Sequence, residues 1–136
     1  MVEPLTPAAL APAAGDEDRP TRPALRRGLL CRCPACGRGT LFSRYLKVVD
    51  RCGDCGTELH HHRADDGPAY LTILIVVHLV GFALGPMVEG GMAPLTIALV
   101  LSALAILSSL WLLPRMKGLL VAVQWAKRMH GFGRAA

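Results

Sequence analysis

The sequence AYLTILIVVHLVGFALGPMV occupies residues 69–88, and PLTIALVLSALAILSSLWLL occupies residues 94–113. Neither stretch contains Asp, Glu, Lys or Arg, and each is 20 residues long. An α-helix of that length extends about 30 Å, which is the thickness of the hydrocarbon core of a bilayer. The rest of the chain cannot supply a soluble core around two such helices, so we expect two transmembrane helices.

The charges around these stretches predict how the helices are oriented. Residues 89–93 (EGGMA) form a link too short for anything but a tight antiparallel hairpin, and its only charge is Glu89. Basic side chains flank the outer ends of both stretches: Arg44, Lys47, Arg51, Arg63, Arg115, Lys117, Lys127 and Arg128. Because basic residues stay on the cytoplasmic side, we expect both termini inside and the link outside.

Small and polar residues recur on one side of each predicted helix. On the first helix His78, Gly81 and Gly85 share a face, and such stripes allow close approach of helix backbones. The second helix carries its own stripe, formed by Ala98, Ser102, Ala105 and Ser109. We expect the two stripes to meet. An ionisable group at this depth is often functional, so His78 could hydrogen-bond Ser102, ligate haem or metal, or relay a proton.

The strongest chemical motif precedes the apolar stretches. CPACG at 33–37 and CGDCG at 52–56 are separated by fifteen residues, and segments 40–42 and 45–49 predict the strands of a short hairpin. Two such turns bring four thiolates to one tetrahedral centre. We therefore predict a zinc-ribbon-like module over residues 26–60, with one structural zinc per chain. Its ligands are Cys33, Cys36, Cys52 and Cys55.

Other uses of these cysteines are less consistent with the pattern. Disulfides are disfavoured on the reducing cytoplasmic side, and the symmetric spacing disfavours an iron–sulfur cluster. A rubredoxin-like iron site uses similar turns and stays an alternative. Four thiolates leave no open coordination position, so the site should be structural and not hydrolytic. The fifth cysteine, Cys31, could be a spare thiol, replace Cys33 or be acylated.

Residues 61–68 form a polar connector between the module and the first apolar stretch. Imidazoles and carboxylates are ordinary metal ligands, so a second and weaker site for copper, zinc or iron is one hypothesis. Its ligands would be His60, His61, His62, Asp65 and Asp66. The alternative, which we favour, is a solvated linker whose imidazoles face lipid phosphate.

The two ends of the chain differ in character. Residues 1–25 are rich in Pro and Ala and predict a disordered leader. Residues 114–136 predict a basic amphipathic helix and tail on the cytoplasmic membrane surface, with Trp125 near the headgroups. A cytoplasmic extension of the second transmembrane helix is the alternative. The expected fold is thus a membrane protein: a cysteine module, a transmembrane hairpin and a C-terminal amphipathic helix.

The sequence disfavours catalysis. It contains no nucleophile–base pattern, phosphate-binding loop or dinucleotide fingerprint, so we expect neither an enzyme nor a small-molecule substrate. Zinc ribbons often bind nucleic acid or protein. The hairpin offers no basic and aromatic stripe beyond Phe42, Arg44, Tyr45 and Lys47, which disfavours nucleic acid.

In combination, six motifs resemble the bacterial "domain of unknown function 983" family over about residues 26–130. They are CPACG at 33–37, GTLF at 39–42, DRCGDCG at 50–56, HRADDGPA at 62–69, RMKGLL at 115–120 and QW at 124–125. The resemblance implies a small inner-membrane protein without an assigned activity. In many proteobacteria its members' genes neighbour those for haem-copper cytochrome oxidase and its assembly factors.

These observations lead to three hypotheses. The first is a non-enzymatic accessory protein that supports assembly or stability of a respiratory membrane complex and has a membrane-protein partner. The second is metal or haem handling through the His-rich connector. The third is a membrane-tethered regulator whose ribbon binds nucleic acid or protein.

Overall fold

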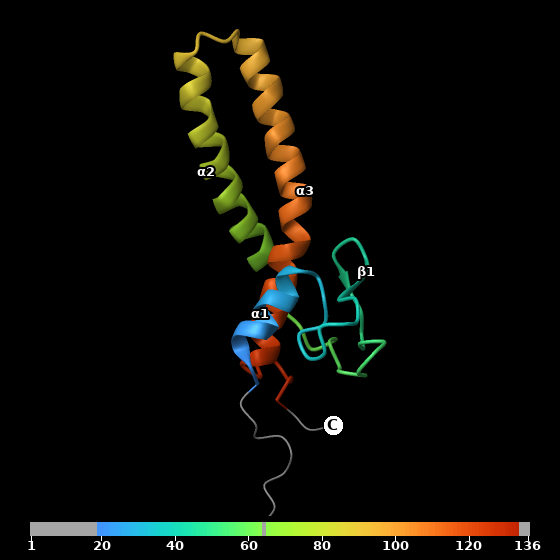
Figure 1. The fold of residues 1–136 in the computed structure, drawn as a ribbon. Coiled ribbons are helices and arrows are strands. Elements are labelled where there is room, and N and C mark those ends of the chain that lie inside the picture. Colours follow the sequence, from blue (N-terminus) through green and yellow to red (C-terminus); the bar gives the residue numbers. More distant parts are fainter. Residues whose placement is uncertain (1–18, 64, 134–136) are drawn as a thin grey trace, which may run out of the picture.

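The computed structural model describes residues 19–63 and 65–133. Two long helices lie side by side and project from a small domain that contains the cysteine module (Figure 1). The elements, in chain order, are α1 (Thr21–Leu29), β1 (Phe42–Arg44), β2 (Lys47–Val48), α2 (Gly67–Glu89) and α3 (Pro94–Ala126). Residues 1–18 of the predicted leader lie outside the described residues.

Helices α2 and α3 are both long and apolar enough to cross a membrane. Helix α2 extends slightly beyond the predicted residues 69–88, with Pro68 in its first turn, where a missing N–H breaks no helical hydrogen bond. Residues 90–93 join the two helices. Gly91 has a φ of +68° there, a left-handed conformation that favours glycine.

The second long helix does not end where the apolar stretch ends. Helix α3 continues through Pro114 to Ala126, so the separate surface helix predicted from residue 114 is wrong, and the alternative of a continuous extension is found. Pro114 has no N–H to donate to the carbonyl of Leu110. The hydroxyl of Tyr45 donates to that carbonyl instead, at 2.9 Å. A side chain from the hairpin thus replaces the missing donor.

The faces on which α2 and α3 meet differ from the prediction. A Cβ atom added at Gly81 or Gly85 would have no neighbour within 4 Å, so these glycines do not contact α3. The buried residues of α2 are Pro68, Thr72 and Val76, and the half-buried Val80, Ala83 and Met87 continue the series at intervals of three or four residues. The larger side chains make this contact because they bury more apolar surface, which leaves the small stripe on an outer face.

The predicted polar partners are also not brought together. The Nδ1 atom of His78 lies 2.7 Å from the carbonyl oxygen of Leu74 in its own helix, which is the contact found in place of one with Ser102. On α3, Ala105 and Ser109 are half-buried, whereas Ala98 and Ser102 are exposed.

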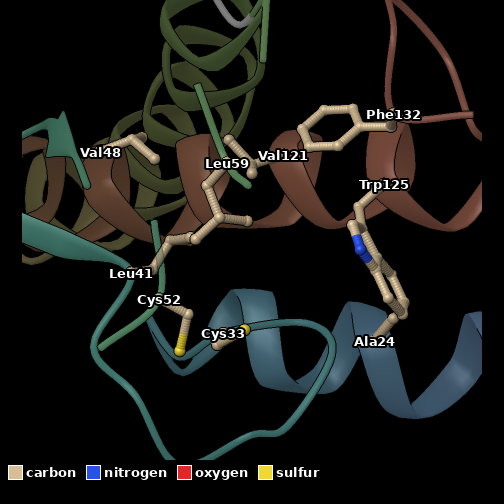
Figure 2. Packing of buried hydrophobic residues seen from close by; sticks show 9 residues of the cluster. All are labelled: Ala24, Cys33, Leu41, Val48, Cys52, Leu59, Val121, Trp125 and Phe132. Carbon is tan, nitrogen blue, oxygen red and sulfur yellow. The ribbon is translucent and has the colours of Figure 1, made fainter. Parts of the chain in front are cut away.

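A hydrophobic core fills the space between α1, the cysteine module and the last third of α3 (Figure 2). Ala24 of α1, Leu41 and Leu59 of the module, and Val121 of α3 are all fully buried. Residues 21–25 therefore belong to α1 and not to a disordered leader, because Ala24 packs in this core. Trp125 is 8% exposed and reaches toward Ala24, so its side chain packs in this core and is not on the exposed face of a surface helix as predicted.

Helices α1 and α3 touch through their backbones at one point. Gly28 and Gly118 are both buried, and a Cβ atom on either residue would overlap the carbonyl oxygen of the other. Only glycine permits this approach, because any side chain would separate the helices.

Candidate metal centre

Two matching turns present the four predicted thiols. The amide of Gly37 donates to the carbonyl of Cys33 at 2.9 Å, and the amide of Gly56 donates to that of Cys52 at 3.0 Å. Both glycines have a φ of +71°, which a residue with a side chain rarely adopts. The repeated CxxCG motif therefore folds into the same turn twice, and the hairpin between the turns places them opposite each other.

The size of the sulfur cluster fits one metal ion. All four Sγ atoms lie within 4.8 Å of one another. The Cys33 Sγ to Cys55 Sγ and Cys36 Sγ to Cys52 Sγ distances are each 3.7 Å. A tetrahedral ion with metal–sulfur bonds of about 2.3 Å separates its sulfur ligands by about 3.8 Å. A disulfide requires about 2.0 Å, so the geometry fits ligation and not cross-linking.

The four thiols lie in different environments. Cys33 and Cys52 are buried in the core, Cys36 is half-buried and Cys55 is exposed. Burial raises the pKa of Cys33 to about 12, whereas hydrogen bonds from the backbone amides of Gly39 and Arg38 lower the pKa of Cys36 to about 6. A bound cation would stabilise the buried thiolate that the apolar core disfavours.

Gly39 is a residue of the centre that the cysteine spacing alone does not reveal. A Cβ atom at Gly39 would overlap the Sγ atom of Cys52. The carbonyl of Gly39 also accepts a hydrogen bond from the amide of Cys33 at 2.8 Å, so this glycine contacts both turns. Its only signal in the sequence is its place at the start of the GTLF motif.

Side chains missed in the sequence fasten the centre to the helices. The guanidinium of Arg27 on α1 donates to the carbonyls of Pro34 at 3.1 Å and Ala35 at 2.7 Å, within the first turn. The ammonium of Lys117 on α3 donates to the carbonyl of Leu46 at 2.6 Å, next to the bond between Tyr45 and Leu110. The module is therefore held by α1 on one side and by α3 on the other.

Comparison with known proteins places the chain in a family. The sequence model of the family described as "Protein of unknown function (DUF983)" matches residues 42–125. The chain belongs to this family. The match begins in β1 and includes the second CxxCG turn, α2, and α3 up to Trp125. No match was found among the curated proteins or among the solved structures.

A second group of possible ligands lies in the connector of this DUF983 protein. Ligand atoms of Glu58, His60 and His61 lie within 4.8 Å of one another. The Nε2 atom of His61 lies 3.2 Å from Oε2 of Glu58, a contact that lowers the pKa of this carboxyl group. The other carboxylate oxygen, Oε1, accepts a hydrogen bond from Arg51 at 2.7 Å.

The composition of this second group differs from the predicted one. Glu58 was not predicted, because it precedes the histidine run and resembles an ordinary exposed acid. The Nδ1 atom of His62 lies 2.9 Å from the carbonyl of Leu59, and neither Asp65 nor Asp66 belongs to the group. The reason is local: the chain turns at residues 60–61, which directs neighbouring side chains to different sides.

Cys31 does not join the four clustered thiols. Its side chain is half-buried, its backbone has a φ of +58°, and burial raises the pKa of its thiol. Cys33 is one of the four clustered residues, and Cys31 does not take its place.

Proposed function

We propose that this DUF983 protein is a non-enzymatic accessory protein of the bacterial inner membrane. In this proposal a structural zinc ion holds a docking module at the cytoplasmic end of a transmembrane hairpin. The observation that supports it best is the close cluster of four thiols in a module that is hydrogen-bonded to α3 through Tyr45 and Lys117. Four thiolates saturate a tetrahedral zinc ion, so no position is left for a substrate.

The distribution of polar groups supports the membrane orientation. Glu89, at the far end of the hairpin, is the only charged residue between positions 69 and 113. Exposed Tyr70 and Trp111 both lie at the end of the hairpin away from Glu89. The Cζ atom of Arg115 lies 3.7 Å from the centre of the Trp111 ring. Aromatic and basic residues favour the cytoplasmic interface, so both termini would lie in the cytoplasm.

The uncovered helix surface supports a membrane-protein partner. Gly81 and Gly85 lie on an outer face of α2, where a partner helix could approach closely. The family resemblance suggests the partner class, a haem-copper oxidase or its assembly factors. The docking module would then contact the cytoplasmic side of the same complex.

Metal content is the first test. Elemental mass spectrometry of the detergent-purified chain should give one zinc ion per chain, and the Cys36→Ser/Cys52→Ser variant should give none. Iron in place of zinc would contradict the structural zinc site.

The partner is tested by affinity purification of a tagged chain from its host membrane. We expect oxidase subunits or assembly factors to co-purify. A Gly81→Leu/Gly85→Leu variant should lose them while keeping its zinc, because these positions have free space in the isolated chain. Purification without any respiratory subunit or assembly factor would contradict the proposed partner.

Metal handling is a second candidate function, favoured by the grouping of Glu58, His60 and His61. Copper or iron beyond the structural zinc should then be lost in a His60→Ala/His61→Ala/His62→Ala variant. Equal metal content in the variant and the wild type would exclude this function.

A further inference from the structure

We propose that a basic groove beside α1 binds the phosphate of an anionic phospholipid headgroup. This inference rests on the membrane insertion proposed above. The groove has a volume of about 780 Å³, and its lining includes four arginines and two apolar side chains: Arg22, Arg26, Arg27, Arg32, Pro23 and Leu30. It lies on the side of α1 next to the first cysteine turn, where Gly37 also contributes to the lining.

The positive charge of the groove is not neutralised by the part of the chain that the structure describes. Arg27 uses its guanidinium to bind the backbone of the first cysteine turn. Arg22, Arg26 and Arg32 are exposed, and none of them has a carboxylate partner among residues 19–63 and 65–133. Arg22 and Arg26 are four residues apart on α1, so they project from the same side of the helix. Among the described residues, an anionic ligand would therefore meet no competing carboxylate at these three cations.

The crossing of α1 and α3 places the groove at the membrane surface. Gly28 packs on Gly118, which lies five residues beyond Leu113, the end of the apolar stretch. Five residues of α-helix extend about 7.5 Å, and the headgroup layer on each side of the hydrocarbon core is about 5–8 Å thick. Figure 1 shows α1 beside the last part of α3, beyond the level at which α2 begins.

The mixture of side chains fits an amphiphile. Guanidinium groups bind phosphate oxygens through paired hydrogen bonds, and basic residues near a bilayer attract anionic lipids. Leu30 is 59% exposed and follows Gly28 by two residues, so it can contact the apolar part of the lipid near the headgroup. A soluble phosphate or a nucleic acid would gain nothing from this leucine.

Native mass spectrometry of the full-length, zinc-loaded chain in detergent tests the proposal. Phosphatidylglycerol, cardiolipin and phosphatidylcholine would be added separately. We expect one retained anionic lipid per chain and no retained phosphatidylcholine. Each removed charge should weaken binding about fivefold, so an Arg22→Gln/Arg26→Gln/Arg32→Gln variant should bind about 100-fold more weakly. A Leu30→Ser variant should lose selectivity for lipid over free phosphate.

The matched control removes three exposed charges outside the groove, as Arg44→Gln/Arg63→Gln/Lys127→Gln, and should bind like the wild type. Equal weakening in both triple variants would overturn the groove in favour of general attraction to the basic surface. Displacement of the lipid by inorganic phosphate or a short oligonucleotide at equal concentration would also overturn it. Zinc content is measured on the same samples, and bilayer insertion is measured on the same purified chains after reconstitution into liposomes. Loss of either in the wild type would count against the proposed function, whereas loss of lipid selectivity alone would count only against the groove.

Discussion

At the residue scale, single atoms decide whether the metal centre and the long helix can form. Gly39 leaves room for a buried sulfur ligand, and the hydroxyl of Tyr45 satisfies a carbonyl that Pro114 leaves without a donor. For each of these two contacts the chain offers a control position, Gly53 for Gly39 and Pro114 for Tyr45. Each contact can therefore be tested apart from general effects on folding.

Replacing Gly39 with alanine should weaken zinc binding about 10- to 100-fold, the usual effect of disturbing the surroundings of a metal ligand. The added methyl group would displace the Sγ atom of Cys52. Competition with a chromogenic chelator measures the change. Gly53→Ala is the control, since Gly53 is next to Cys52 but has open space around it. Equal zinc affinity in the two variants would contradict the proposed role of Gly39.

Replacing Tyr45 with phenylalanine should lower the free energy of unfolding by about 0.5–1.5 kcal/mol, because the carbonyl of Leu110 loses its donor. Pro114→Ala restores a backbone N–H at that position. In the Pro114→Ala background, Tyr45→Phe should therefore have a much smaller effect. Denaturant unfolding in detergent, arranged as a double-mutant cycle, measures this coupling. Additive effects of the two substitutions would show that Tyr45 does not compensate for the proline.

At the element scale, the glycines of this chain have opposite roles. Gly28 and Gly118 allow α1 and α3 to touch, whereas Gly81 and Gly85 lie on an uncovered face of α2. A sequence pattern of small residues identifies positions where helices can approach, but it does not say which partner approaches them. Substitutions with alanine distinguish the two roles.

Gly118→Ala should destabilise the isolated chain by about 1–3 kcal/mol, although alanine is the better helix former, because its methyl group would overlap the backbone of α1. Gly81→Ala is the matched control and should leave stability unchanged or raise it by up to about 1 kcal/mol. Thermal unfolding in detergent compares them. The proposed helix crossing would be excluded if Gly118→Ala were as stable as the control.

At the scale of the whole molecule, the cysteine module and the long helices share one structure. The core joins Ala24 of α1 and Leu41 of the module to Val121 of α3. Hydrogen bonds from Tyr45 to α3 and from Arg27 to the first cysteine turn strengthen this connection. Removal of the metal should therefore affect more than the cysteine turns.

Stripping the metal with a chelator should expose the amides of α1 and of residues 114–126 to hydrogen exchange, while residues 69–88 and 94–113 stay protected by lipid or detergent. Mass spectrometry of peptides reports each region separately. A return of protection after zinc is added back would be the control for reversible loss. Unchanged exchange in α1 and in residues 114–126 would show that the module unfolds independently.

The parts of the fold that depend on local patterns were predictable from the sequence. Two uncharged apolar stretches and two CxxCG motifs identify the long helices and the four thiols without knowledge of distant contacts. The continuous α3 was not the preferred prediction, because proline usually ends a helix and its compensation comes from Tyr45, 65 residues away in the chain. Nor does any spacing rule link Glu58 to the histidine pair, because that grouping depends on how the chain turns at residues 60–61.

The shared core also sets an order of biogenesis. Ribosomes release the cysteines first, but the surface against which they pack includes Val121 and Trp125, which are synthesised after both apolar stretches. In the proposed membrane topology, the hairpin would therefore leave the translocation machinery before the thiols could reach their folded positions. Metal acquisition would then be a late step in maturation, and we expect a chain truncated after Leu113 to keep both apolar stretches but to lack the support for its metal centre.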